Sequence, residues 1–124
     1  MIGIDLVNIK RFENFYKKFG KKALLRYLCQ DEIELSKKRL ETLCGFYAAK
    51  EAISKALGCG IGKKLNFHDI ILHKTKDNAP YFTLPKEIIE KYNIKNLSLS
   101  ITHEKEYAIA VAFIEANKQE ILSH

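Results

Sequence analysis

Residues 46–64 read FYAAKEAISKALGCGIGKK and join a strong helical pattern to a glycine-rich ending. The apolar positions of the helical part share one face, made by Phe46, Ala49, Ile53, Ala56 and Leu57. This spacing predicts a long helix over about residues 40–57 that packs against the rest of the chain. One glycine is enough to end a helix, yet three glycines follow here within five residues, and two lysines come next.

Strands and shorter helices are predicted on both sides of this helix. The N-terminal stretch MIGIDLVNI alternates large aliphatic residues with Gly3, Asp5 and Val7, as a strand does, and Asn8 suits the cap of a following helix. The other predicted elements are helices over about 9–19 and 23–28 and from residue 30, strands within 67–75 and 80–84, a helix after Pro85, and a hairpin over about 97–113. Helices and strands mix without a regular β-α-β period, which predicts an α+β fold.

The returning strand of the hairpin has one face of small residues only, Ala108, Ala110 and Ala112. Another element can approach such a face closely. Two alternatives remain open at this point: the face is covered by an element of the same chain, or it packs against a neighbouring copy.

The composition, with 124 residues of which 47% are hydrophobic and 29% charged, is typical of one soluble globular domain. We expect residues 1–124 to form that single domain, with 116–124 as a polar tail. Apolar runs are too short to span a membrane, and no leader segment precedes the first strand, so a cytoplasmic location is expected. The cysteines are odd in number and separated, which favours reduced thiols, and any metal would be a hard cation held by oxygen.

The net charge of +6 is concentrated near the N-terminus. This basic segment contains Lys10, Arg11, Lys17, Lys18, Lys21, Lys22 and Arg26. Such a cluster favours an anionic partner, which could be a nucleic acid, an acidic membrane or an acidic protein. The alternative is that these lysines are merely solvated.

Three features are candidates for chemistry, each with a plain alternative. Asp5 is unusual inside an apolar strand and needs a cation, a proton or hydrogen bonds, which a nearby backbone could also supply. Glu51 lies one helical turn before Lys55, and the two could form an ordinary surface pair. The loop 58–64 could turn several amide groups toward a phosphate, or it could be a glycine-rich helix cap. It lacks the pattern of a P-loop or a dinucleotide site.

Four segments together resemble the holo-acyl-carrier-protein synthases, the small, single-domain phosphopantetheinyl transferases. They are GIDLVNIKR at 3–11, RYLCQDE at 26–32, YAAKEAISKALGCGIG at 47–62 and LSITHEKEYAIA at 99–110. The resemblance runs from residue 2 to about 115. It implies the fold of that family, in which an antiparallel sheet packs against a long helix with shorter flanking helices.

The resemblance also implies an activity. The enzyme would move 4′-phosphopantetheine from coenzyme A to a serine of an apo-acyl carrier protein, for fatty acid biosynthesis, and release adenosine 3′,5′-bisphosphate. It would need Mg²⁺, with Asp5 and Glu51 in the places of the metal ligands and Lys55 near the transferred phosphate. The general base for the serine hydroxyl is hypothesised to be a metal-bound water that passes the proton to Glu51. Asp5 is the less favoured alternative to Glu51 in this role.

Other positions match the parts of the family that meet the two substrates. Those matched to the coenzyme are Lys55, Gly58, Gly60, Ile61, Ser100, Thr102 and His103. Arg11 matches the arginine used toward the carrier protein, and its neighbours Lys18, Lys22 and Arg26 would add to docking of that acidic partner. Relatives are homotrimers with sites between subunits, so the same assembly is expected here. Cys59 and Glu104 stand where the family commonly has threonine, so we expect altered affinity with retained activity.

The rival hypothesis is a non-enzymatic, basic RNA-binding module. It accounts for the charge and for an aromatic content of 10%. It leaves Asp5 and Glu51 without a role, and the chain lacks RRM and KH motifs. The resemblance therefore favours an enzyme with no nucleic acid or membrane as partner.

Overall fold

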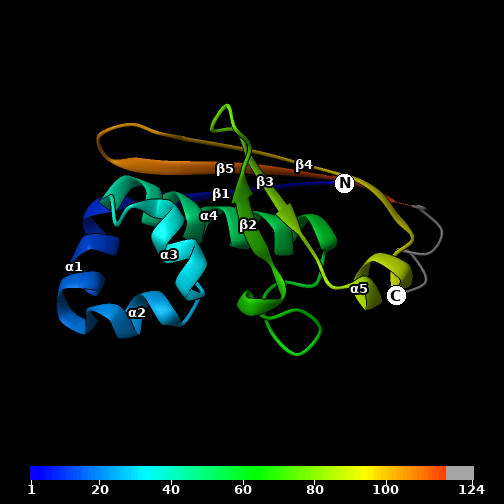
Figure 1. The fold of residues 1–124 in the computed structure, drawn as a ribbon, viewed down its shortest axis with the longest axis horizontal. Coiled ribbons are helices and arrows are strands. Elements are labelled where there is room, and N and C mark those ends of the chain that lie inside the picture. The colour runs from blue at the N-terminus through cyan, green and yellow to red at the C-terminus, as the bar shows by residue number, and fades with distance from the viewer. Residues whose placement is uncertain (117–124) are drawn as a thin grey trace.

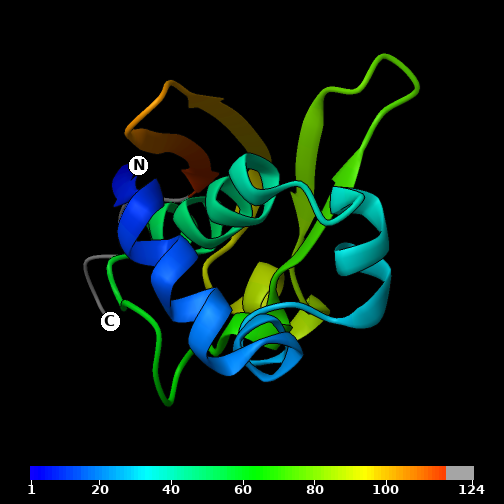
Figure 2. The same cartoon turned by 90° about the vertical axis from the view of Figure 1, so that its left-hand side faces the viewer.

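The long helix lies between two sheets in the computed structural model, which describes residues 1–116 (Figures 1 and 2). The elements are, in order, β1 (Ile2–Asn8), α1 (Ile9–Phe19), α2 (Lys21–Leu25), α3 (Gln30–Ser36), α4 (Leu40–Leu57), the 3-10 helix η1 (Phe67–Asp69), β2 (Ile71–Lys74), β3 (Pro80–Thr83), α5 (Lys86–Lys91), β4 (Ile94–His103) and β5 (Tyr107–Ala116). The α+β prediction is confirmed. Within the described residues, every helix is too short or too polar to cross a membrane.

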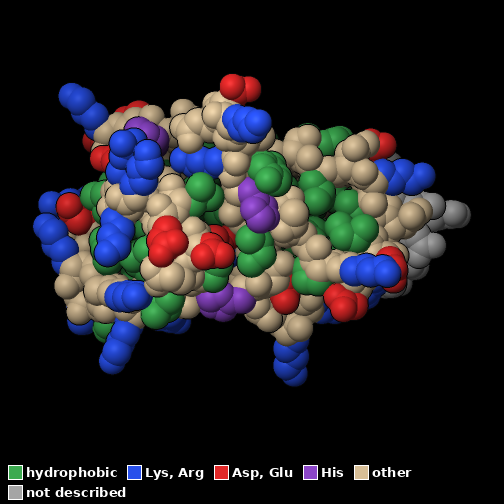
Figure 3. Space-filling model, in the orientation of Figure 1, with side chains coloured by type: hydrophobic (Ala, Val, Ile, Leu, Met, Phe, Trp, Pro, Cys, Tyr) green, Lys and Arg blue, Asp and Glu red, His purple; other side chains and the backbone are tan. Residues whose placement is uncertain are grey.

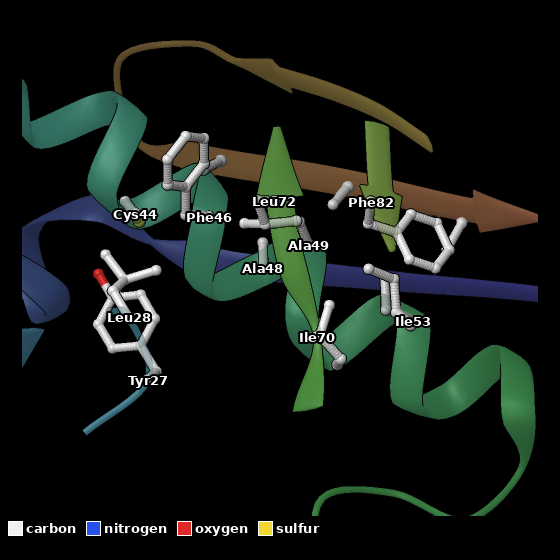
Figure 4. Close-up of a cluster of buried hydrophobic side chains, with 14 of the residues drawn as sticks. Tyr27, Leu28, Cys44, Phe46, Ala48, Ala49, Ile53, Ile70, Leu72 and Phe82 are labelled. Carbon is white, nitrogen blue, oxygen red and sulfur yellow. The ribbon is translucent and has the colours of Figure 1, made fainter. Parts of the chain in front are cut away.

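One sheet has the order β1-β5-β4 with antiparallel neighbours, and β2 pairs with β3 in a second antiparallel sheet. Helix α4 passes between the two sheets, while α1, α2 and α3 gather at one end of the molecule and α5 lies at the other (Figure 1). Buried side chains of α4 and of the β2–β3 pair, including Ile53, Leu72 and Phe82, belong to one core cluster (Figure 4).

Several predicted boundaries are confirmed. Helix α4 begins and ends at Leu40 and Leu57, the predicted residues. The side chain of Asn8 caps α1 by accepting a hydrogen bond from the Arg11 amide at 2.9 Å. Gly20 ends α1 with a positive φ of 60°, a conformation that glycine adopts without strain.

Several predicted boundaries are wrong. The second helix spans Lys21–Leu25 rather than about 23–28, because the chain tightens after Leu25 and the Tyr27 amide donates to the Leu24 carbonyl. The hairpin is longer than predicted, since β4 begins at Ile94 and β5 ends at Ala116. The strand expected within 67–75 begins only at Ile71. A 3-10 turn precedes it, because the Asn66 side chain accepts from the His68 amide at 3.0 Å and holds that turn. The predicted tail at 117–124 lies outside the described residues.

Candidate functional site

Strand β1 lies directly on α4 because residue 3 is glycine. A Cβ atom at Gly3 would overlap the carbonyl oxygen of Ala52 and lie 2.5 Å from the amide nitrogen of Ala56. The small face of β5 makes the same approach possible, since Ala108, Ala110 and Ala112 are fully buried. Of the two alternatives for that face, the structure therefore supports the one within the chain.

This close approach places Asp5, two residues after Gly3 on the same face of β1, beside the C-terminal half of α4. The ammonium of Lys55 lies 2.7 Å from Asp5 Oδ1 and 3.2 Å from the Ile4 carbonyl oxygen. Lys55 is half exposed, whereas 15% of the Asp5 side chain is exposed. The cation that a carboxylate in an apolar strand needs is thus Lys55, and the simple surface pair of Lys55 with Glu51 is not what forms.

Glu51 lies beside this pair. Partial burial raises the pKa of the Glu51 carboxyl above its ordinary value, and the charge of Asp5 raises it further, while the charge of Lys55 and the nearby Tyr47 hydroxyl oppose the shift. The negative charge of Asp5 therefore acts on Glu51, although the two residues are far apart in the sequence. The structure brings together all three residues predicted to carry the chemistry, Asp5, Glu51 and Lys55.

The arrangement fits an open Mg²⁺ site better than a closed one. Mg²⁺ is usually bound through one or two carboxylates, and water and substrate phosphates complete its coordination. Among residues 1–116 no group of three or more His, Cys, Asp or Glu side chains is placed to hold a metal. Asp5 and Glu51 could thus hold the ion only together with oxygens from a bound substrate.

The glycine-rich loop after α4 is a helix cap in this structure. The Gly58 and Gly60 amides donate to the last carbonyls of α4, and the Gly62 amide donates to the Leu65 carbonyl. Gly58 and Gly60 have positive φ values of 80° and 66°. These amides are therefore engaged within the chain, and the exposed charges beside the loop are those of Lys63 and Lys64. Ile61, also predicted to contact the coenzyme, packs partly on the core.

The coenzyme residues predicted on β4 are not brought to Asp5 within one chain. Ser100 pairs with Val111 and Thr102 with Ile109, so both side chains share the face of the sheet that turns away from α4. His103 is exposed at the end of β4. A single chain thus presents the carboxylates on one face of this sheet and the two hydroxyls on the other.

The face of the sheet that carries Ser100 and Thr102 also exposes large apolar side chains. Ile2, Ile4 and Leu6 of β1 are 69%, 59% and 56% exposed. Their neighbours on β5 are exposed as well, since Phe113 pairs with Ile2 and Val111 pairs with Ile4. We call these five residues the outer apolar face. Monomeric proteins rarely leave such contiguous surfaces uncovered.

An open, mostly apolar cavity of about 370 Å³ lies beside the basic segment. Its walls are formed by Val7, Asn8, Arg11, Phe12, Phe15, Ala23, Arg26, Tyr27, Tyr47 and Phe67. Two of the four predicted docking residues, Arg11 and Arg26, therefore border the cavity, while Lys18 and Lys22 are exposed on α1 and α2. Lysine and arginine side chains gather at the end of the molecule where α1, α2 and α3 lie (Figure 3).

Sequence reasoning missed one feature of α4. Lys50 is fully buried in an ion pair with Glu32, at 3.0 Å. A signal for this was present, because Lys50 follows Phe46 of the apolar face by four residues, a spacing that places two side chains on the same side of a helix.

The chain is similar over nearly its whole length to curated proteins of one family. A curated holo-[acyl-carrier-protein] synthase of Sulfurimonas denitrificans is 52% identical over 116 residues, which cover 94% of this chain and 95% of that protein. The one of Helicobacter pylori strain 26695 is 47% identical over 119 residues, with 96% and 100% covered.

A crystal structure of the Helicobacter pylori holo-[acyl-carrier-protein] synthase in complex with coenzyme A superposes with a TM-score of 0.90 at 49% identity, and the match covers 93% of this chain and all of that one. The model of the 4′-phosphopantetheinyl transferase superfamily matches residues 1–112, a range that contains both carboxylates, the glycine loop, β1, β4 and the first part of β5. The chain belongs to the 4′-phosphopantetheinyl transferase superfamily.

Proposed function

We propose that this protein is a holo-acyl-carrier-protein synthase, which transfers 4′-phosphopantetheine from coenzyme A to a serine of an apo-acyl carrier protein. The observation that carries the proposal is the cluster of Asp5, Glu51 and Lys55 where β1 crosses α4. Relatives at about half identity over nearly the whole chain bear the name of this activity. The same proposal includes two further points: the modified carrier protein serves fatty acid biosynthesis, and this protein acts in the cytoplasm.

In this reaction the serine oxygen of the carrier protein forms a bond to the phosphorus of the arm. The P–O bond to adenosine 3′,5′-bisphosphate breaks, and the serine proton passes to a base. Asp5 and Glu51 would hold Mg²⁺, which when bound withdraws negative charge from the phosphate oxygens. Lys55 has a half-exposed ammonium on a flexible stem, so it can turn from Asp5 toward the leaving phosphate and neutralise it.

Docking of the acidic carrier protein is assigned to the basic segment. Arg11 and Arg26 border an apolar cavity, so they offer charge beside a place for an apolar side chain. Lys18 and Lys22 extend the positive surface around them. Such a field raises association rates by about 10–10³-fold and weakens with salt.

The proposed assembly is a homotrimer with active sites between subunits. The outer apolar face gives each chain a surface to bury, and Ser100 and Thr102 lie on the same side of the sheet. Because Asp5 and Glu51 lie on the other side, a complete coenzyme site needs a second chain. Sedimentation should give three times the chain mass, and Ile4→Lys with Phe113→Lys should yield an inactive monomer. Tyr81→Lys, an exposed site on the β2–β3 pair, is the control that stays assembled.

The activity is tested by mass spectrometry. Incubation with coenzyme A, Mg²⁺ and apo-carrier protein should add about 340 Da, the mass of the phosphopantetheine arm, to the carrier. Omission of Mg²⁺, Asp5→Ala and Glu51→Ala should each abolish the added mass in a protein that remains folded. An unmodified carrier with the wild-type enzyme overturns the proposal.

A further inference from the structure

His68 links two elements that both border the apolar cavity beside the basic segment. Its ring nitrogen Nε2 lies 3.0 Å from the carbonyl oxygen of Leu25, the last residue of α2. Because a carbonyl oxygen only accepts hydrogen bonds, Nε2 carries the proton and donates it. His68 belongs to η1, which follows α2 only after the whole of α3 and α4. The bond therefore joins two parts of the fold that are far apart in the sequence.

The two bonded residues are each next in sequence to a residue of the cavity wall. Leu25 precedes Arg26, and His68 follows Phe67. Arg26 and Phe67 both line the cavity. Residues that follow each other along the chain have Cα atoms only about 3.8 Å apart. The hydrogen bond therefore holds a charged wall residue and an aromatic wall residue in place relative to each other.

Helix α2 depends on tertiary contacts for its position. It has five residues, and helices this short are not stable alone in water. Ala23 and Leu24 anchor its inner side, since both are buried. The Leu25 carbonyl lies at the helix end, where carbonyl oxygens have no partner within the helix. The His68 ring supplies a partner for this carbonyl at the exposed side of α2.

The other end of the link is held by several contacts. The buried ammonium of Lys50 donates to the Phe67 carbonyl oxygen at 3.0 Å. The Asn66 side chain accepts from the His68 amide at 3.0 Å. The ring of Phe67 packs against that of Tyr27, with their centroids 6.2 Å apart. The turn η1 is thus a fixed support from which the His68 ring reaches α2.

We propose that His68 is a positioning residue for carrier-protein docking, which holds Arg26 beside Phe67 through its hydrogen bond to the Leu25 carbonyl. This inference rests on the proposed function. The residues proposed for the transfer step belong to β1 and α4, and not to the two elements that this bond joins. Loss of the bond should therefore weaken binding of the carrier protein and leave the transfer step nearly unchanged.

The test varies the donor at residue 68. His68→Leu removes it, and His68→Asn places a donor one bond closer to the backbone, too short to reach the Leu25 carbonyl. His68→Gln places an amide nitrogen as many bonds from Cα as Nε2 is, so it should restore the contact. We expect KM for the carrier protein to rise about 3–10-fold in the first two variants, as for loss of one hydrogen bond, and to return to within about twofold in the third.

Other measurements separate docking from folding and chemistry. His68→Leu removes an exposed hydrogen bond, so Tm should stay within about 2 °C of wild type, with kcat and KM for coenzyme A within about twofold. His73→Leu is the matched control with unchanged kinetics. The His73 Nε2 also makes a hydrogen bond, with the Thr83 hydroxyl at 3.1 Å, but His73 lies on β2 and is not part of the cavity wall.

Two outcomes with these variants would contradict the proposal. If His68→Leu lowers Tm by several degrees and weakens the use of both substrates equally, His68 only supports the fold. If His68→Gln is as impaired as His68→Leu, the hydrogen bond is not what matters. A carrier protein whose serine is replaced by alanine cannot be modified, so its Kd for each variant gives the same comparison without turnover.

A double-mutant cycle asks whether His68 acts through Arg26. In an Arg26→Ala background, His68→Leu should raise KM for the carrier protein less than about twofold, against 3–10-fold in wild type. Equal increases in both backgrounds overturn the proposal. Wild-type protein that transfers no arm overturns the proposed function itself, whereas wild-type transfer with an unchanged KM in His68→Leu removes this inference alone.

Discussion

Helix α4 carries two lysine–carboxylate pairs whose lysines are five residues apart, and the pairs differ in burial. Lys50 and Glu32 are 0% and 1% exposed, and their atoms are 3.0 Å apart. Lys55 and Asp5 are closer, at 2.7 Å, but 51% of the lysine side chain is exposed. A short distance therefore does not tell which pair supports the fold.

The hydrogen bonds around each pair show which of the two supports the fold. The carboxylate of Glu32 also accepts from the Cys29 amide at 2.9 Å and from the Leu72 amide at 2.8 Å, and Lys50 donates to the Phe67 carbonyl oxygen at 3.0 Å. The buried pair thus ties α3, α4, η1 and β2 together with its polar atoms engaged. Asp5 and Lys55 make fewer hydrogen bonds than their groups allow, so donors and acceptors remain for a bound ligand.

The largest effect is expected at the buried pair. Lys50→Met leaves the Glu32 charge buried without a cation, so unfolding free energy should fall by about 3–5 kcal/mol, and Tm by at least about 10 °C. Urea unfolding measures this loss. Burial lowers the pKa of Lys50 from its ordinary value against the pull of Glu32, which shows that the pair carries a desolvation cost.

Two further measurements sharpen that prediction. Combining Lys50→Met with Glu32→Leu should recover much of the lost stability, because no uncompensated charge remains. Cys44 is buried and its pKa is raised to about 12, mainly by desolvation, so it should resist alkylation in the native protein and react faster in Lys50→Met. A single variant as stable as wild type would contradict this role.

The next effect is expected at the open pair and concerns activity. Lys55→Met removes the positive charge proposed for the leaving phosphate, so kcat should fall by about 10²–10³-fold. Stability should fall by less than in Lys50→Met, because half of the Lys55 side chain is already exposed to water. Thermal unfolding and the mass-shift rate are measured on the same sample. Retained activity with lost stability would reverse the roles of the two pairs.

A smaller effect is expected from charges that form no ion pair within residues 1–116. Arg11 and Lys22 are exposed on α1 and α2. Reversing both to Glu should raise KM for the carrier protein about tenfold or more and make it less sensitive to salt, while coenzyme A binding stays nearly unchanged. Equal losses for both substrates, measured by steady-state kinetics, would show that this surface does not select the carrier.

The smallest effect is expected at an exposed helical pair. Lys86 and Glu90 of α5 lie 3.8 Å apart and are 86% and 67% exposed, with the lysine in the less favourable N-terminal position. Lys86→Met should change unfolding free energy by less than about 0.5 kcal/mol and leave transfer unchanged. It is the matched control for Lys50→Met, since both remove one lysine charge from a helix.

Local patterns predicted most elements of this fold. The bounds of α4, the Asn8 cap and the Gly20 stop depend on residues close in the chain, and side-chain spacing and capping chemistry act at that range. The candidate site was predicted through motifs for Asp5, Glu51 and Lys55. The ion pair of Lys50 was not predicted, because its partner Glu32 lies on another helix and comes close only when the chain folds.

The sequence by itself determined the helical and extended periods, the alternation of β1 and the residues able to bind a cation. Only the tertiary structure decided which face of β1 is covered: the face with Gly3 and Asp5 lies against α4, and that with Ile2 and Ile4 stays open. Alternation is symmetric between two faces, and the choice depends on what a distant helix can approach. Gly3 and the alanines of β5 admit α4, and large aliphatic side chains would hold it away.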